Sequence, residues 1–310
     1  MVKFVKGCFR APLHVKSLYQ MKKISLFFLM LAIASAVSAQ PGRRTKIDTV
    51  YLWPDGAPNA FEIPGPESGF IVFRANEYKD AMMEVYPAKN PNGLCVIMCP
   101  GGAYIMQSQT YEGRDLKDWF NSRGITYCML QYRLPVGHHD VPLSDVQQAI
   151  RIMRGKAEEL GITKVGIMGN SAGGHLAASA AVLYDGPDTR PDFQILMYPV
   201  ITMEESFTNM LSRDALLGKN PAQELVDRYS CEKHVTQDTP PAFIVLCSDD
   251  PDVSPLNSIR YYEQLLANNV SASMHIYPDG GHGWGWRDTM IYKENWVSAM
   301  EDWIRNTIQK

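Results

Sequence analysis

Short apolar runs rich in β-branched and aromatic residues alternate along this chain with longer amphipathic stretches. The runs expected to form strands are residues 81–86, 94–99, 125–132, 164–168, 193–198, 242–247 and 272–277. Helical periodicity marks most of the stretches around them, at residues 113–122, 144–160, 171–184, 221–229, 255–268 and 291–308. The alternation predicts an α/β fold with a mostly parallel central sheet and helices on both faces.

Two regions add detail to this outline. Ser144 is expected to cap the N-terminus of the helix that starts there, and Gly161 is expected to end it, because these residue types favour those positions. Residues 200–240 form the longest stretch without a clear strand, and they are mostly polar. This composition favours a small cap, or none, over a large apolar lid.

The N-terminus has the pattern of a targeting segment. From Met21 the chain carries two lysines, an apolar run and then small residues up to Ala39. This order is typical of a secretory signal peptide cleaved after Ala39, with residues 1–20 as an upstream extension. The apolar run of about 14 residues is too short to cross roughly 30 Å of hydrocarbon. We therefore expect an exported protein, periplasmic or secreted, without membrane contact after cleavage.

The remaining chain is expected to hold one large domain. Residues 40–79 are rich in Pro and Gly and form an N-terminal loop and strand segment, and residues 80–310 form the α/β domain itself. Without residues 1–39 the chain has 24 Lys and Arg against 33 Asp and Glu, a formal charge of −9. This acidity argues against nucleic acid or an anionic membrane as a partner and favours neutral small molecules or sugars.

The cysteines and histidines do not form a metal or disulfide pattern. Five cysteines follow residue 39, an odd number, and most lie inside apolar runs. They are expected to be buried thiols rather than a disulfide framework. Neither paired zinc-type cysteine spacing nor an H-E-x-x-H motif is present. We expect no metal and no cofactor.

Ser171 is the candidate nucleophile. It lies in Gly-Asn-Ser-Ala-Gly, directly after the strand at 164–168 and before a helix of small residues. Gly169 and Gly173 leave room for the tight turn that such a serine needs. A G-x-S-x-G string alone is a weak signal, because it occurs by chance in roughly one chain in ten of this length. Its position between strand and helix makes it specific.

Two loops supply partners for this serine. His282 follows the last strand in a glycine-rich loop and is the candidate general base. The acid that orients the imidazole is expected from the loop after the strand at 242–247, where Asp249, Asp250 and Asp252 compete. The loop Cys-Pro-Gly-Gly-Ala-Tyr after the strand at 94–99 offers backbone donors for an oxyanion hole. We expect these donors to be the N–H groups of Gly102, Ala103 and Ala172.

The motifs PGGAY, GNSAGGHLA and GGHGWG resemble the α/β-hydrolase superfamily, in particular a carbohydrate-esterase branch related to hormone-sensitive lipase and prolyl oligopeptidase. WPDGAP and YRLPVGHHDVPLSDVQQAIRIMR resemble exported acetyl-xylan-esterase-type proteins. The resemblance covers about residues 80–310. It favours Asp250 as the acid, because Val253 and Ser258 stand at the spacing common in relatives. Many relatives have His where this chain has Pro100.

This resemblance implies a serine ester hydrolase that removes O-acetyl groups from a plant polysaccharide such as xylan. A feruloyl or general short-chain carboxylesterase is the alternative, and a serine peptidase is a weaker one. A glycosidase would need two carboxylates flanking the scissile bond, and a non-catalytic binding protein would leave the Ser, His and Asp unexplained. Tyr104 and Trp284 adjoin the catalytic loops, where they either stack on sugar rings or pack against the fold.

Overall fold

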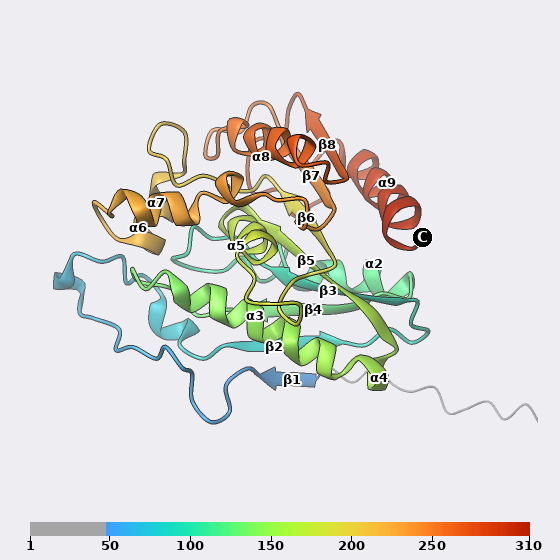
Figure 1. Cartoon of the computed structure of the whole chain (residues 1–310), viewed down its shortest axis with the longest axis horizontal. Coiled ribbons are helices and arrows are strands. Elements are labelled where there is room, and N and C mark those ends of the chain that lie inside the picture. The colour runs from blue at the N-terminus through green and yellow to red at the C-terminus, as the bar shows by residue number, and fades with distance from the viewer. Residues whose placement is uncertain (1–47) are drawn as a thin grey trace, which may run out of the picture. The chain divides into compact units, whose positions relative to one another are not determined.

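Eight strands form one sheet in the computed structural model, which describes residues 48–310 (Figure 1). Their order across the sheet is β1-β2-β4-β3-β5-β6-β7-β8. The strands are β1 Asp48–Tyr51, β2 Met82–Tyr86, β3 Gly93–Cys99, β4 Thr126–Gln131, β5 Ile162–Asn170, β6 Phe193–Met197, β7 Ala242–Cys247 and β8 Ala272–Tyr277. The pairs β1–β2 and β2–β4 are antiparallel, and all others are parallel. The predicted mostly parallel sheet is confirmed.

The strands that pair in parallel at the centre are continuous apolar runs because both of their faces are covered. Every residue of β6 and β7 is buried, and all but the first residue of β3 is buried. The edge strand β8 is only partly buried. The strand β1, which the apolar pattern did not predict, extends the antiparallel edge and joins residues 48–51 to the same sheet.

The helices cover the sheet in two groups. Their bounds are α2 Lys117–Ser122, α3 Asp140–Gly155, α4 Ala157–Leu160, α5 Ser171–Val182, α6 Met210–Leu217, α7 Gln223–Tyr229, α8 Leu256–Ala267 and α9 Lys293–Trp303. Helix α3 packs against α5 (Figure 1), whereas Arg123, just after α2, pairs with Glu301 of α9 at 2.7 Å. A short π-helical turn, Ile304–Ile308, continues α9.

One predicted helix start is wrong. Helix α3 begins at Asp140, four residues before Ser144, and Pro142 occupies its first turn, where a missing N–H costs nothing. The Ser144 hydroxyl instead donates to the Val141 carbonyl oxygen at 2.8 Å. The predicted single helix is also interrupted: α3 ends at Gly155, and Gly161, with φ +65°, closes the separate short helix α4 in the left-handed conformation that glycine favours.

Residues 200–240 form a small layer beside the sheet rather than a large lid. They contain α6, α7 and a 3₁₀ turn at Cys231–His234, and Figure 1 places α6 and α7 to one side of α5. Helix α6 was not predicted. Its N-terminus is capped by the Asn209 side chain, which accepts a hydrogen bond from the Ser212 N–H at 2.9 Å.

All five cysteines of the described residues are buried free thiols, as the sequence predicted. Cys95 and Cys128 approach closest, with 3.9 Å between their sulfur atoms. Within residues 48–310, no helix is both long enough and apolar enough to cross a membrane. The predicted signal peptide and its cleavage point lie outside the described residues.

Candidate active site

Ser171 lies where β5 ends and α5 begins, at the carboxyl edge of the sheet. Its backbone has φ +53°, the left-handed conformation of a sharp turn. Two glycines make the turn possible. A Cβ atom at Gly169 would come within 2.1 Å of the Gly173 carbonyl oxygen, and one at Gly173 within 2.1 Å of the Cys99 carbonyl oxygen. The predicted role of both glycines is thus a steric one.

The structure brings Ser171, His282 and Asp250 together in a hydrogen-bonded chain. His282 Nε2 lies 2.8 Å from Ser171 Oγ, and His282 Nδ1 lies 2.7 Å from Asp250 Oδ2. The other Asp250 oxygen accepts two backbone N–H groups, from Asp252 at 2.9 Å and Val253 at 2.8 Å. The imidazole therefore donates to Asp250 through Nδ1–H and accepts the Ser171 hydroxyl proton at Nε2.

Asp249, the alternative acid, has a different position. Its carboxylate accepts the N–H groups of Gly281 at 2.8 Å and Gly280 at 3.2 Å. These bonds, first that from Gly281, lower the pKa of Asp249. Asp249 therefore fixes the backbone of the loop that carries His282, and it makes no hydrogen bond to the imidazole.

The backbone after β3 forms a turn that can receive an oxyanion. Gly102, Ala103 and Tyr104 have φ values of +132°, +51° and +59°. The Gly102 carbonyl oxygen accepts the N–H groups of Ile105 and Met106, three and four residues further along the chain. Among residues 48–310, the N–H groups of Gly102 and Ala103 donate to no protein acceptor. Ala172 lies in the first turn of α5, where an N–H has no partner within the helix.

A cavity of about 310 Å³ opens onto Ser171 and His282. Gly102 and Ala103 line it, together with Asp252, which competed as the acid. Seven further lining residues were not singled out from the sequence: Ile105, Met106, Ser108, Tyr111, Glu112, Asn209 and Leu211. Arg287 stacks over the Tyr111 ring, 3.6 Å from its centre. The predicted nucleophile, the predicted base and two of the three predicted oxyanion donors, Gly102 and Ala103, therefore share one cavity.

The two aromatic residues predicted to bind substrate do not line this cavity. Tyr104 is only 1% exposed, and its hydroxyl is hydrogen-bonded to His175 Nδ1 at 2.8 Å. Trp284 is 4% exposed, and its ring packs against Tyr198 and Trp296. A sugar ring cannot stack on a face that other side chains cover, so the packing alternative holds for both residues.

Comparison with known proteins identifies the family. Residues 96–285 match the family model described as the alpha/beta hydrolase fold. This match spans more than half of the chain and contains Ser171, His282 and Asp250.

The chain belongs to the α/β-hydrolase family.

The similar proteins are named as an esterase, a xylanase and a bifunctional hydrolase. An acetylxylan esterase of Xylanibacter ruminicola is 37% identical over 73% of this chain and 48% of its own length. An endo-1,4-beta-xylanase B of Butyrivibrio fibrisolvens is 35% identical over 61% of this chain and 32% of its own length. The chain thus spans half or less of these relatives. The solved acetyl ester-xyloside bifunctional hydrolase of Caldicellulosiruptor lactoaceticus superposes with a TM-score of 0.73 at 31% identity, covering 86% of this chain and 98% of its own.

In this α/β hydrolase a buried carboxyl group joins the three loops of the site. Glu112 Oε2 accepts the Gly101 N–H at 3.0 Å, and Oε1 accepts the Tyr198 hydroxyl at 2.7 Å. The Tyr198 oxygen in turn accepts Asn170 Nδ2–H at 2.7 Å and the Gly285 N–H at 2.9 Å. Burial raises the pKa of Glu112. The oxyanion turn, the residue before Ser171 and the His282 loop are therefore held by one network.

Removal of this network should slow the chemistry without weakening substrate binding. We expect Glu112→Ala to lower kcat on p-nitrophenyl acetate by about 10²-fold with KM nearly unchanged, because small displacements of positioned groups cost that much. Glu112→Gln keeps one acceptor oxygen, enough for the Gly101 N–H but not for the Tyr198 hydroxyl as well, and should recover part of the loss. An equal loss in both variants at an unchanged melting temperature would show that the hydrogen bonds are not what matters.

Two other histidines of the described chain, His175 and His139, are held inside the fold by hydrogen bonds. Burial lowers the pKa of His175 to about 4, and its ring is held between Tyr104 and the Tyr229 carbonyl oxygen. The His139 ring is hydrogen-bonded to the Tyr229 hydroxyl at 2.8 Å. Across residues 48–310 there is no group of three His, Cys, Asp or Glu side chains placed to hold a metal ion.

Proposed function

We propose that this α/β hydrolase is a serine carboxylic ester hydrolase. The observation that carries the proposal is the continuous chain from Asp250 through His282 to Ser171, which ends in an open cavity beside unpaired backbone N–H groups. In this mechanism His282 takes the proton from Ser171 as the serine oxygen attacks the ester carbonyl. Asp250 stabilises the resulting imidazolium.

The backbone supplies the remaining chemistry. The N–H groups of Gly102, Ala103 and Ala172 stabilise the oxyanion of the tetrahedral intermediate. His282 returns its proton to the departing alcohol, which leaves an acyl group on Ser171. His282 then activates a water molecule that releases the acid and restores the serine.

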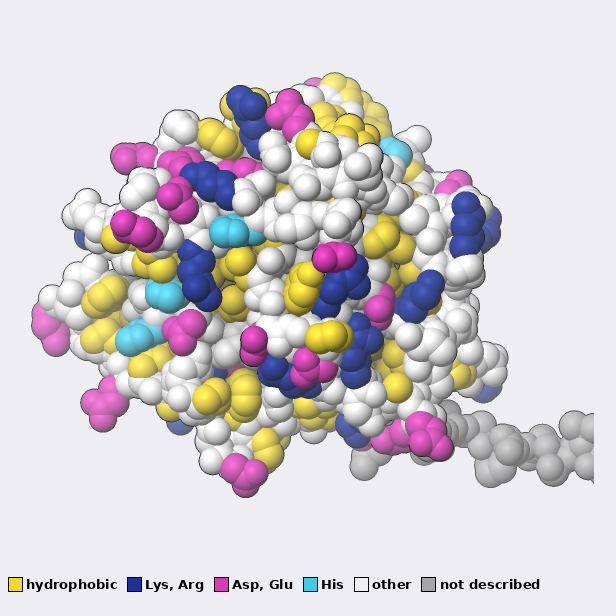
Figure 2. Space-filling model, in the orientation of Figure 1, with side chains coloured by type: hydrophobic (Ala, Val, Ile, Leu, Met, Phe, Trp, Pro, Cys, Tyr) yellow, Lys and Arg dark blue, Asp and Glu magenta, His cyan; other side chains and the backbone are white. Residues whose placement is uncertain are grey.

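O-acetyl groups on xylan are the substrate we propose. One similar protein, 37% identical, is named an acetylxylan esterase, and another, 31% identical, is named an acetyl ester-xyloside bifunctional hydrolase. Acidic and basic side chains are interspersed on the face shown in Figure 2, so this face carries no large patch of a single charge. Feruloyl and other short-chain esters are the alternative chemistry for the same three residues.

A glycosidase mechanism fits the site less well, although one relative is named a xylanase. The carboxylates that line the cavity are Glu112 and Asp252. Both oxygens of Glu112 accept hydrogen bonds from the protein, and Asp250 is bound to His282. Glu112 could act as one of two carboxylates flanking a glycosidic bond only if its hydrogen bonds with Gly101 and Tyr198 were broken.

The test is acetate release from acetylated xylan by residues 40–310, measured beside hydrolysis of p-nitrophenyl acetate and butyrate. We expect acetate release and a preference for the acetyl over the butyryl ester. If the protein cleaves the synthetic esters but releases no acetate from xylan, the proposed ester hydrolase activity stands and acetylated xylan is rejected as its substrate. Release of xylose from a xyloside instead would reject the esterase.

We further propose export, on the pattern of residues 21–40. Expression of the full chain in a bacterium with two membranes should yield a protein outside the cytoplasm that begins at Gln40. N-terminal sequencing of the fractionated protein measures this. Recovery from the cytoplasm with an intact N-terminus would contradict it.

A further inference from the structure

A second cavity, of about 200 Å³, lies between the N-terminal segment of the described chain and the ends of β2 and β4. It shares no lining residue with the cavity that opens onto Ser171. Four aromatic side chains contribute to its wall: Tyr51, Trp53, Phe61 and Tyr78. Tyr51 is 60% exposed, and its ring makes no aromatic or cation–π contact within residues 48–310. The catalytic mechanism uses none of these residues.

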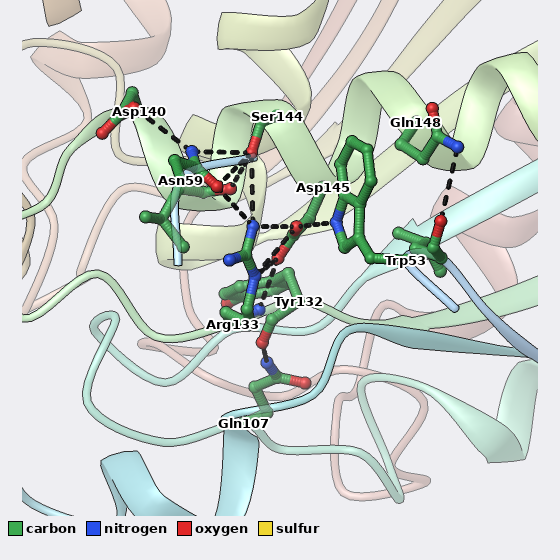
Figure 3. Close-up of polar contacts among 11 residues, drawn as sticks. Trp53, Asn59, Gln107, Tyr132, Arg133, Asp140, Ser144, Asp145 and Gln148 are labelled. Atoms are coloured by element: carbon green, nitrogen blue, oxygen red, sulfur yellow. Dashed lines mark hydrogen bonds and ion pairs between the residues drawn. The ribbon is translucent and has the colours of Figure 1, made fainter. Parts of the chain in front are cut away.

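A buried arginine contributes a free donor to this wall. Arg133 Nε and Nη2 are bound to the Asp145 carboxylate, with contacts of 2.6 to 3.1 Å, and Nη2 also donates to Asn59 Oδ1 at 2.8 Å. The Trp53 indole N–H donates to the same carboxylate at 2.7 Å. Figure 3 shows the guanidinium held between Asn59 and Asp145, with its remaining nitrogen directed away from both.

That remaining nitrogen, Nη1, has no hydrogen-bond acceptor among residues 48–310. The Arg133 side chain is only 6% exposed, yet Nη1 is not among the fully buried unpaired atoms of the described chain. Nη1 therefore keeps some accessible surface and has unused donors, and Arg133 lines the cavity. A guanidinium so firmly held presents its free N–H groups in a fixed direction.

The positive and negative charges around the cavity balance, which favours a neutral ligand. Asp145 neutralises Arg133, and Lys79 and Asp80 add one charge of each sign to the lining. A strongly anionic or cationic ligand would gain little from this balance. Aromatic faces beside scattered donors and acceptors suit a ring that is apolar on its faces and carries hydroxyl groups at its edge.

The volume limits the size of what is enclosed. At about 30 Å³ per water molecule, 200 Å³ corresponds to the space of about six or seven waters. This is below the roughly 300 Å³ at which pockets for larger small molecules begin. The cavity therefore has room for a single sugar ring, and the exposed face of Tyr51 can contact a neighbouring unit.

We propose that this cavity is a second saccharide-binding site, which holds one pyranose unit of the polymer whose esters Ser171 cleaves. The choice of polymer rests on the function proposed above. One segment separates the two cavities: Met106 and Ser108 line the catalytic cavity, and between them the Gln107 carbonyl oxygen accepts the Tyr78 hydroxyl at 3.4 Å. A polymeric substrate is thus held beside the catalytic serine by contacts that a small ester does not make.

The direct test is calorimetric titration of Ser171→Ala protein with xylohexaose, which carries no ester. The same titration is then made with Tyr51→Ala added, and with Ala60→Trp, which fills the cavity from its exposed side. We expect saturable binding that weakens at least five-fold in both double variants. Phe73→Ala is the matched control, because Phe73 is 56% exposed in the same N-terminal segment and does not line the cavity.

Kinetics of the otherwise unchanged enzyme provide the second readout. Tyr51→Ala should raise KM for acetylated xylan several-fold while kcat and the rate on p-nitrophenyl acetate stay as they were. The proposed site would be overturned if Tyr51→Ala, Ala60→Trp and Phe73→Ala all bind xylohexaose equally. It would also be overturned if the protein binds no xylo-, cello- or manno-oligosaccharide at all. Tyr51-dependent binding of a cello- or manno-oligosaccharide, without acetate release from xylan, would support the site and reject xylan as its polymer.

Discussion

Ser171→Ala is expected to lower kcat on p-nitrophenyl acetate by about 10⁶-fold, the scale seen when a serine nucleophile is removed from a triad. The alanine methyl group cannot attack a carbonyl, and no other hydroxyl lies within hydrogen-bond reach of His282 in the described structure. Acetate release from xylan should disappear with it. The variant should fold normally, because the substitution removes one oxygen from a turn whose geometry depends on Gly169 and Gly173.

Ser108→Ala is the matched control for this experiment. Ser108 lines the same cavity, and its hydroxyl accepts a hydrogen bond from Tyr111 at 3.1 Å rather than from His282. Its loss should change kcat by less than about ten-fold. Stoichiometric labelling by a fluorophosphonate should occur in the wild-type and Ser108→Ala proteins and be absent from Ser171→Ala. Retained hydrolysis in Ser171→Ala would assign the nucleophile elsewhere.

The positions of the three triad candidates were predictable because each follows a strand that could be recognised. Strands β7 and β8 have the predicted bounds, and β5 contains the predicted run. The carboxyl ends of parallel strands meet at one edge of a sheet, so residues distant in sequence there come together. Asp250 and Asp249 could not be separated in this way, because both lie in the loop after β7. Their carboxylate orientations decide between them.

The substrate cavity was not predictable to the same degree. Tyr104 adjoins Ala103 in sequence, but three successive left-handed residues turn its side chain into the core. Leu211 lies in the short helix α6 and Asn209 is its N-terminal cap, and both line the cavity. They belong to residues 200–240, whose mostly polar sequence did not predict this helix. Sequence patterns place residues on elements. The direction of a side chain in a loop depends on backbone angles that such patterns do not encode.

The second large effect is expected from Asp250→Asn, which should lower kcat by about 10⁴-fold, as wrong-tautomer substitutions do. One Asp250 oxygen accepts two backbone N–H groups, from Asp252 and Val253, and the other faces His282 Nδ1. An asparagine must direct its carbonyl oxygen to the two N–H groups, since its NH₂ group cannot accept from them. The NH₂ group then faces Nδ1 and places the imidazole proton on Nε2, where it can no longer accept the Ser171 proton.

Asp249→Asn is the matched control, one residue away with the same change of charge. Asp249 is exposed and its carboxylate binds only the backbone of Gly280 and Gly281, so the asparagine oxygen can keep one of these bonds. We expect kcat to fall by less than about ten-fold. The comparison uses kcat on p-nitrophenyl acetate at neutral pH, with the melting temperature of each variant recorded. A larger loss in Asp249→Asn than in Asp250→Asn would assign the acid of the triad to Asp249, because both substitutions remove the same charge from the same loop and only Asp250 contacts His282.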